Sequence, residues 1–274
     1  MIALIDGDVV TYSSSFAAQK KYYSIGCTVY DSKRKAEKAA SEIDVDFPIS
    51  EEVILSPESH ALSNAKELIT KILDRTKSTE YIVYITASGV ESNYRYKLDT
   101  TYKANRKEQE RPVHYGAVRN YLTDTHGAKL ITGKEADDAM GIRQWDHLNT
   151  DNSTPTIICT VDKDLDMIPG LHYNWRKDVV YEVDDRTALR NFYKQLLIGD
   201  PTDNIKGIKG IGPVTADKIL PIHYSESQMY DVVLSKYKHQ YRERSIEAIL
   251  NIVYTTANLL WIQREEGILW QPPN

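Results

Sequence analysis

Short apolar runs alternate with longer amphipathic stretches over the first two thirds of the chain. The apolar, β-branched and aromatic runs predict strands at residues 2–5, 81–86, 129–131 and 156–161. Apolar positions at helical spacing predict helices between them, at residues 56–75, 112–125 and 135–148. Because strands that alternate with helices form βαβ units, the pattern predicts an α/β fold with a mainly parallel sheet flanked by helices.

The pattern changes near residue 184, after which only helical periodicity remains. Helices are predicted at residues 186–197, 213–220, 226–237 and 244–261. We therefore predict an α/β domain over 1–184 and a helical subdomain over 185–274. The charged stretch at 31–46 has no core-forming pattern and is interpreted as an insertion or mobile excursion.

Composition is that of an ordinary globular chain, with 41% hydrophobic and 27% charged residues among 274. No apolar run has the length of a membrane span, and the first residues lack the features of a secretory leader. Cys27 and Cys159 lie far apart in the sequence, which argues against a disulfide framework or a zinc site and favours a reducing cytoplasm. The net charge of −5 is weak evidence against nucleic acid, because the distribution of charge matters more than its sum.

Acidic side chains follow several of the predicted strands. The carboxyl ends of parallel strands share one edge of a sheet, where ligands bind in open α/β folds. Two more acids, three residues apart, precede a glycine-rich turn and can face the same way. The set comprises Asp6, Glu135, Asp137, Asp138, Asp162, Asp164, Asp200 and Asp203.

Each acidic motif taken singly is more often structural, since acids cap helices and favour their N-termini. Together they are a different matter, because two carboxylates about 4 Å apart repel by roughly 4 kcal/mol at an effective dielectric near 20. Oxygen ligands without histidine or cysteine select Mg²⁺ or Mn²⁺ over zinc. The sequence therefore predicts two Mg²⁺ ions, replaceable by Mn²⁺, of the kind that hydrolyse phosphodiesters.

A glycine-rich turn follows the last acids and precedes a predicted helix that starts at Pro213 and contains Lys218. Gly207, Gly210 and Gly212 let the backbone approach phosphate closely, and the helix N-terminus then faces the anion. The segment has the form of a helix–hairpin–helix that grips a nucleic-acid backbone without reading bases. A simple connector between two helices is the alternative.

Basic and aromatic residues are interleaved between residues 94 and 112. Positive charge beside aromatic rings is typical of single-strand contact, in which bases stack and phosphates pair. A solvated charged face is the alternative. The residues are Tyr94, Arg95, Tyr96, Lys97, Tyr102, Lys103, Arg106, Lys107 and Arg111.

The ordered motifs DGD, YKANR, EADD, TVDKDLD and GDPTDNIKGIKGIG resemble those of the 5′-nuclease (flap endonuclease-like) superfamily over residues 2–220. The resemblance is closest to phage 5′–3′ exonucleases and to the N-terminal nuclease domain of bacterial DNA polymerase I. It implies a PIN-like domain, a helical arch near residues 90–112 and a helix–three-turn–helix element. It assigns metal-ligand roles to the eight acids, phosphate handling to Lys103 and Arg106, base stacking to Tyr102, and a K⁺ ion to the hairpin turn.

One position departs from the family pattern. Family members usually carry an aspartate at the end of the strand before the arch, where this chain has Thr86, Ala87 and Ser88. The resemblance thus implies that one outer ligand of the first metal is missing or replaced by water. Asp8 is the candidate to compensate.

We therefore predict a Mg²⁺-dependent 5′–3′ exonuclease or flap endonuclease that acts near 5′ ends, flaps and nicks of DNA and on RNA–DNA hybrids. Arg95, Tyr102, Lys107, the three glycines and Lys218 are the expected DNA contacts. Phage DNA replication is the expected setting, with a monomeric protein in the cytoplasm of the host and no membrane partner. Two alternatives are a PIN-type ribonuclease, which would not need the hairpin turn, and a non-catalytic DNA-binding replication factor, which would not need the acids.

Overall fold

The computed structural model describes residues 1–43, 48–89, 93–106, 110–150 and 154–273. Its contacts divide the chain into two compact units. Unit 1 comprises Met1–Val9, Ile72–Glu110 and Gly127–Asn274, and unit 2 comprises Val10–Lys71 and Arg111–His126. The predicted boundary at residue 184 separates types of secondary structure, whereas the contacts place the sheet and the following helices in the same unit.

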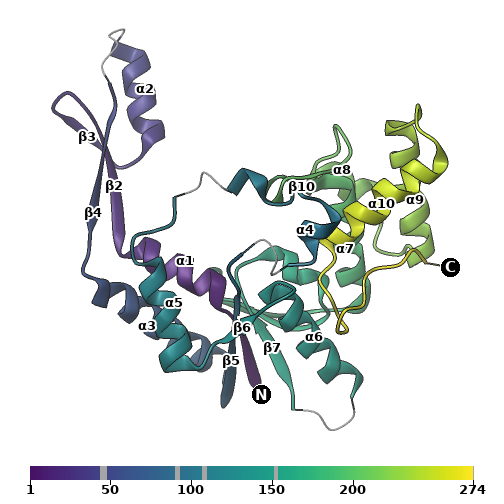
Figure 1. Cartoon of the computed structure of the whole chain (residues 1–274), viewed down its shortest axis with the longest axis horizontal. Coiled ribbons are helices and arrows are strands. Elements are labelled where there is room, and N and C mark those ends of the chain that lie inside the picture. The colour runs from purple at the N-terminus through teal and green to yellow at the C-terminus, as the bar shows by residue number, and fades with distance from the viewer. Residues whose placement is uncertain (44–47, 90–92, 107–109, 151–153, 274) are drawn as a thin grey trace. The chain divides into compact units, whose positions relative to one another are not determined.

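The centre of unit 1 is a six-stranded sheet, confirming the α/β expectation (Figure 1). The four strands next to the predicted site are parallel to one another, and β8 continues in the same direction. The spatial order is β6 (Lys129–Ile131), β5 (Glu80–Thr86), β1 (Ile2–Asp6), β7 (Thr156–Cys159), β8 (Gly170–Asn174) and β9 (Val179–Val183).

Strand β1 occupies the middle of the sheet and is buried along its whole length. Its pairing with β5 places Asp6 opposite Tyr84, so the chain leaves the sheet at its carboxyl edge with Asp6. Gly7 is required at the next position, because a Cβ there would lie 2.6 Å from the carbonyl oxygen of Tyr84. Helix α6 (Ala136–Asn149) packs against β1, β5 and β7 and covers the apolar side chains of Leu4 and Ile158.

Strands β8 and β9 form an antiparallel hairpin that the apolar pattern does not predict. Strand β8 is mostly buried but contains His172 and Asn174, and β9 is mostly exposed and contains Glu182, so no long apolar run marks the hairpin. The one-turn helix η3 (Lys163–Met167) lies between β7 and β8 and carries Asp164.

The helices after residue 184 confirm the second half of the pattern. They are α7 (Asp185–Ile198), α8 (Pro213–Ile219), α9 (Glu226–Gln240) and α10 (Ile246–Leu260). Phe192, Tyr193, Val233, Tyr237 and Val253 form part of their shared core. Between α7 and α8 the chain makes a two-stranded ladder, β10 (Gly199–Asp200) with β11 (Ile205–Lys206), around the 3-10 turn η4 (Pro201–Asp203).

Unit 2 contains most of α1 (Gly7–Ala17) and α3 (Glu58–Thr76), together with α5 (Tyr115–His126). A three-stranded antiparallel sheet has the order β3-β2-β4, formed by Thr28–Tyr30, Gln19–Ile25 and Ser50–Leu55. The stretch interpreted as an insertion without a pattern contains helix α2 (Lys33–Ile43), and residues 44–46 of it lie outside the described residues. Among the residues of α2 whose burial the structure describes, Ala36 is fully buried.

The predicted arch is only partly described. Between residues 93 and 106 the structure has a single helical turn, α4 (Arg95–Leu98), and the 3-10 turn η2 (Ala104–Arg106). Residues 90–92 and 107–109, and with them Lys107, lie outside the described residues. No helix in the described ranges combines the length and the apolar character that crossing a membrane would demand.

Candidate active site

Asp6, Asp137, Asp162 and Asp164 form what we call the inner acid group, at the carboxyl edge of the sheet. Asp6 ends β1 and is 2% exposed, and its Oδ1 accepts a hydrogen bond from the backbone N–H of Val9 at 2.9 Å. Its Oδ2 accepts from the Thr160 hydroxyl at 2.7 Å. Asp162 caps η3 by accepting from the N–H of Asp164 at 2.9 Å.

The pKa values show that these carboxyl groups act on one another. Burial, followed by the charge of Asp8, raises the pKa of Asp6 to about 7. Burial and then the charges of Asp6 and Asp162 raise the pKa of Asp137 well above its ordinary value. Burial and then Asp162 raise the pKa of Asp164 to about 7. The strands and α6 thus gather carboxylates whose ionisation is unfavourable without a cation.

Glu135 and Asp203 form a second group, which is compensated by cations of the chain itself. The ammonium of Lys103 donates to Glu135, and its nitrogen is 3.4 Å from Asp203 Oδ2. Arg106 donates to the other oxygen of Asp203. Burial alone would raise the pKa of Glu135, but Lys103 and Arg95 outweigh it and lower that pKa to about 2. At Asp203 burial is the largest influence, and together with the charges of Glu135 and Asp200 it raises the pKa despite both cations.

Asp200 lies between the two groups. Its carboxylate accepts from the N–H of Thr202 at 2.8 Å and thereby caps η4. Its charge contributes to the raised pKa of both Asp164 and Asp203, so it faces each of them. Electrostatic interactions thus link acids from separate segments of the chain, whereas Asp138 pairs with Arg95; the metal-ligand roles of the acids stay a prediction.

The basic segment 101–106 lies against the turn at 200–204 and does not project away from it. The Lys103 N–H donates to the carbonyl oxygen of Asp203 at 2.9 Å, and Lys103 itself has a φ of 54°. The Asn105 amide donates to the Pro201 carbonyl at 2.8 Å, and the Asn204 amide donates to the Thr101 carbonyl at 2.8 Å. These hydrogen bonds explain how cationic side chains come to lie among the acids.

Tyr102 differs from its predicted stacking role. Its side chain is 3% exposed, and its hydroxyl lies 3.0 Å from Asp203 Oδ2 and 3.2 Å from Glu135 Oε2. A ring that is buried against these acids offers no face to a base. The structure therefore gives Tyr102 the role of supporting the second acid group.

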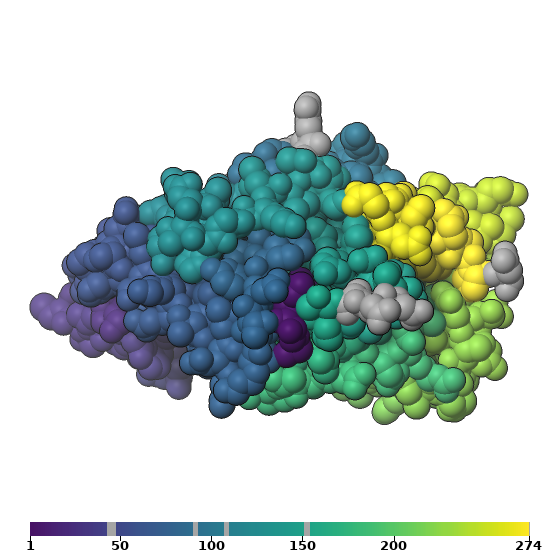
Figure 2. Space-filling view, turned by 90° about the horizontal axis from the view of Figure 1, so that it is seen from below, coloured from purple at the N-terminus to yellow at the C-terminus, as the bar shows by residue number. Residues whose placement is uncertain are grey.

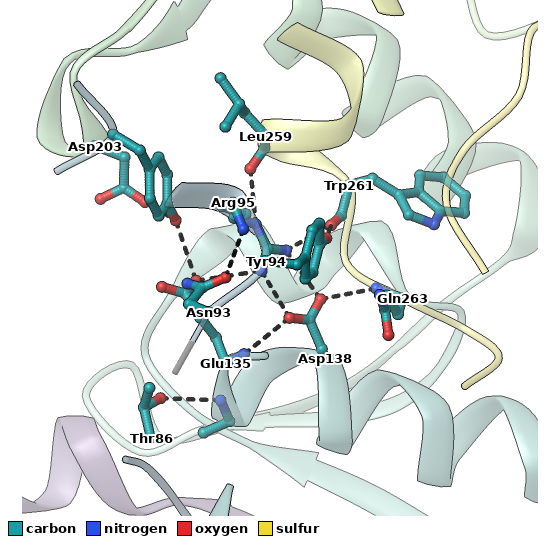
Figure 3. A network of polar contacts seen from close by, with 12 residues as sticks. Thr86, Asn93, Tyr94, Arg95, Glu135, Asp138, Asp203, Leu259, Trp261 and Gln263 are labelled. Carbon is teal, nitrogen blue, oxygen red and sulfur yellow. Dashed lines mark hydrogen bonds and ion pairs between the residues drawn. The ribbon is translucent and has the colours of Figure 1, made fainter. Parts of the chain in front are cut away.

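Arg95 and Asp138 also differ from their predicted roles (Figure 3). We expected Arg95 to bind DNA and Asp138 to bind metal, but the two side chains are 2% and 0% exposed and pair with each other. Arg95 donates to both oxygens of Asp138, at 2.7 and 2.9 Å. Asp138 also accepts from the backbone N–H groups of Glu135 and Gln263, each at 3.0 Å. Its oxygens are thus occupied by N–H donors.

Thr86, which lies where the sequence departs from the family pattern, has a structural role. Its hydroxyl accepts from the N–H of Ala136 at 2.9 Å, at the start of α6. Its own N–H donates to Asp8 Oδ2 at 3.0 Å. The carboxylate of Asp8 therefore lies at the end of β5, beside the position where the family pattern has its aspartate.

Gly207 is held by the chain itself. A Cβ there would lie 2.2 Å from the carbonyl carbon of Ile198 and 2.4 Å from the nitrogen of Gly199. This close approach of β11 to the end of α7 explains the need for glycine without a ligand. The predicted phosphate contact is not required to explain it.

Gly210 and Gly212 have open space around their Cα atoms, and Gly210 has a φ of 82°. Lys218, on α8, is exposed. A cavity of about 610 Å³ borders this turn, and Lys209 and Gln240 are among its lining residues. The Gln240 amide oxygen accepts from the N–H of Lys209 at 2.7 Å, so one backbone donor of the turn is already used.

The donor set decides which ion the site fits. Among the described residues, no group of three or more histidine, cysteine, aspartate or glutamate side chains is arranged to hold one metal ion. The inner acid group nevertheless offers only carboxylate oxygens, and its raised pKa values mark it as a site that a cation would stabilise. Hard divalent cations match this chemistry.

Sequence reasoning missed the Arg95–Asp138 pair and the supporting hydroxyl groups of Thr86 and Thr160. No motif marks such partners, because they are distant in sequence. A buried arginine in a basic stretch is indistinguishable from an exposed one by composition.

The mainly parallel sheet with its flanking helices and helical continuation is a fold that this chain shares with solved 5′-exonuclease structures. The T5 5′-exonuclease with bound zinc has this fold, with a TM-score of 0.59 at 15% identity over 94% of this chain and 88% of that one. The T5 D15 flap endonuclease in a complex with DNA and metal ions has a TM-score of 0.54 at 16% identity, with the same coverage of both chains.

Relatives in sequence agree with this fold, although no family model matches the chain. The exonuclease of Escherichia phage T7 is 28% identical over 46% of this chain and 43% of its own length. Flap endonuclease Xni of Shewanella pealeana is 26% identical over 54% of this chain and 62% of its own length. A 5′-3′ exonuclease of Streptomyces coelicolor is 29% identical over 52% of this chain and 55% of its own length. The matches span about half of each relative and confirm the resemblance to the 5′-nuclease superfamily.

Proposed function

We propose that this chain is a metal-dependent 5′ nuclease that hydrolyses phosphodiesters near 5′ ends, flaps or nicks of DNA. The observation that carries the proposal is the inner acid group, four carboxylates gathered at one sheet edge beside Lys103 and Arg106. A protein that only binds DNA gains nothing from concentrated negative charge, which repels phosphate.

Mg²⁺ is the proposed cofactor, with two ions bound and Mn²⁺ able to replace it. The inner acid group would hold the first ion, and Glu135, Asp200 and Asp203 would contribute to the second. Bound there, the ions supply an activated water and stabilise charge on the departing oxygen. Asp138 is not among the proposed ligands, since four N–H groups already occupy its oxygens.

The residues of the chain bring the scissile phosphate to this edge. Lys103 pairs with Glu135 and Asp203, and we infer that its ammonium exchanges these partners for a phosphate oxygen of the substrate. Arg106, which is more exposed, can bind the neighbouring phosphate with two N–H groups. Gly210, Gly212 and Lys218 would contact the duplex backbone, and a K⁺ ion at the turn belongs to this proposal.

A substrate panel tests the proposal. The chain should release 5′-phosphorylated products from labelled flap, nicked and RNA–DNA hybrid substrates in Mg²⁺, and nothing in chelator. Cleavage of single-stranded RNA alone would favour a PIN-type ribonuclease, and binding of DNA without cleavage in Mg²⁺ or Mn²⁺ would favour an accessory factor. A monomer acting in the cytoplasm of a phage host during DNA replication is the setting we propose.

A further inference from the structure

Arg95 lies at the centre of a buried network that joins three parts of unit 1 (Figure 3). Its Nε donates to the carbonyl oxygen of Leu259 at 2.9 Å, and its Nη2 donates to that of Trp261 at 2.6 Å. The same guanidinium holds both oxygens of Asp138 and lies 3.7 Å from Glu135. Helix α4, the start of α6 and the end of α10 therefore meet at one cation.

The segment after α10 holds this network against α6. The Arg264 guanidinium lies between the rings of Trp145 and Trp261, with its central carbon 4.9 Å from each centroid. Lys134 pairs with Glu266 on the same segment. Figure 2 shows the C-terminal residues, in yellow, on the surface beside residues of α6.

We propose that Arg95 and Asp138 are positioning residues for Glu135, and that the segment from Leu259 to Gln263 completes their support. This inference rests on the proposed nuclease function. Asp138 fixes the backbone N–H of Glu135, and Arg95 places positive charge beside its carboxylate. The pair thus sets the direction in which α6 presents Glu135 and Asp137 to the metal-binding edge.

The buried pair is suited to such a role because its geometry is fully determined. A bidentate arginine–carboxylate pair has a fixed direction, and all of its oxygens here have N–H partners. Removing one partner leaves an uncompensated buried charge, which forces the start of α6 to rearrange. Removing both partners takes away the support without leaving that charge.

The test compares Asp138→Asn, Arg95→Met, the double variant and Arg95→Lys with Asp162→Asn. Metal affinity is read by calorimetric titration with Mn²⁺ in the absence of DNA, and kcat and KM are read separately on a flap substrate. We expect Asp162→Asn to weaken Mn²⁺ binding by about 10-fold or more, and Asp138→Asn and Arg95→Met to change it by less than about threefold.

For turnover, the two single variants should each lower kcat by about 10-fold with KM unchanged, and the double variant should lose no more than either one. Arg95→Lys keeps the charge but not the bidentate geometry, so its kcat should lie between that of the single variants and that of the wild type. If a single variant does not fold, the double variant and Arg95→Lys still decide the question.

Two results would overturn the inference. The first is a loss of Mn²⁺ affinity in Asp138→Asn as large as in Asp162→Asn, with none in Arg95→Met, which would make Asp138 a ligand. The second is reduced stability with unchanged kcat in all folded variants, which would make the pair merely structural. If the wild type cleaves no substrate, the nuclease proposal fails separately, and the Mn²⁺ titrations still judge the role of Asp138.

Discussion

Asp6→Asn is expected to stabilise the metal-free protein at alkaline pH while removing the nuclease activity proposed above. Asp6 is 2% exposed, and its pKa is raised from 3.8 to about 7 by burial and by Asp8. Between these values the unfolded carboxyl group is ionised while the folded one stays protonated. The free energy of unfolding therefore falls as the pH rises through this window, and the full penalty is present above about pH 7.

The magnitude follows from the shift. Roughly three pKa units correspond to about 4 kcal/mol, since one unit is about 1.4 kcal/mol. Neighbouring carboxyl groups share the repulsion, so we expect about half of it, ~2 kcal/mol, to be recovered by one substitution. Asparagine can keep both local contacts, because its oxygen accepts from Val9 and its NH₂ group can donate to the Thr160 hydroxyl.

The assay is urea unfolding in chelator at about pH 4.5 and about pH 8, with wild type, Asp6→Asn and the exposed Asp124→Asn on α5 as control. Asp6→Asn should raise the free energy of unfolding at the higher pH and change it little at the lower one. Excess Mg²⁺ should remove this advantage by stabilising the wild type. An equal effect at both pH values, or the same gain in Asp124→Asn, would refute the reasoning.

The other predictions concern metal, turn and basic segment. Chelation of the metal should abolish cleavage. Asp162→Asn should not cleave in Mg²⁺ or Mn²⁺, but by fluorescence anisotropy it should bind DNA at least as tightly as the wild type. Full activity of this variant would contradict the prediction. Gly210→Val should weaken duplex binding but not Mn²⁺ binding, because only glycine readily adopts its φ of 82°; unchanged affinity would identify the turn as a connector. In single-turnover assays Lys103→Ala should be slower by about 10²-fold with a smaller loss of binding. Arg106→Ala should weaken DNA binding and lower the salt dependence of the binding constant by about one unit. If both variants behave like the wild type, the basic segment is only a charged surface.

The strands next to the acids could be predicted because their short runs are almost continuously apolar, and the helices because their apolar residues recur at helical spacing. Strands β1 and β7 are buried on both faces, and the pattern shows it. Helix α1 was not predicted, since its sequence is rich in β-branched and serine residues, which are weak helix formers. Its helix is specified by the packing of Gly7 against β5 and by the Asp6 cap.

The positions of the acids could also be predicted, but their partners could not. Spacing places Asp138 in the first turn of α6 with Asp137, yet one faces the acid edge and the other faces Arg95. Which face meets which partner depends on a residue 43 positions away in the sequence. Lys103 likewise lies among acids because backbone hydrogen bonds tie its segment to the turn at 200–204.

The carbonyl groups that hold Arg95 have a consequence for the order in which the protein matures during synthesis. The bond from Arg95 to Leu259 closes a loop of 164 residues, for which the entropy of closure is about 4.5 kcal/mol. A nascent chain that has emerged only as far as α9 already contains every acid of the candidate site. It still lacks the acceptors that Arg95 requires, so we expect Glu135 to reach its final orientation only after Leu259 and Trp261 have packed against Arg95. The acids of the candidate site are therefore translated well before the carbonyl groups on which their final arrangement depends.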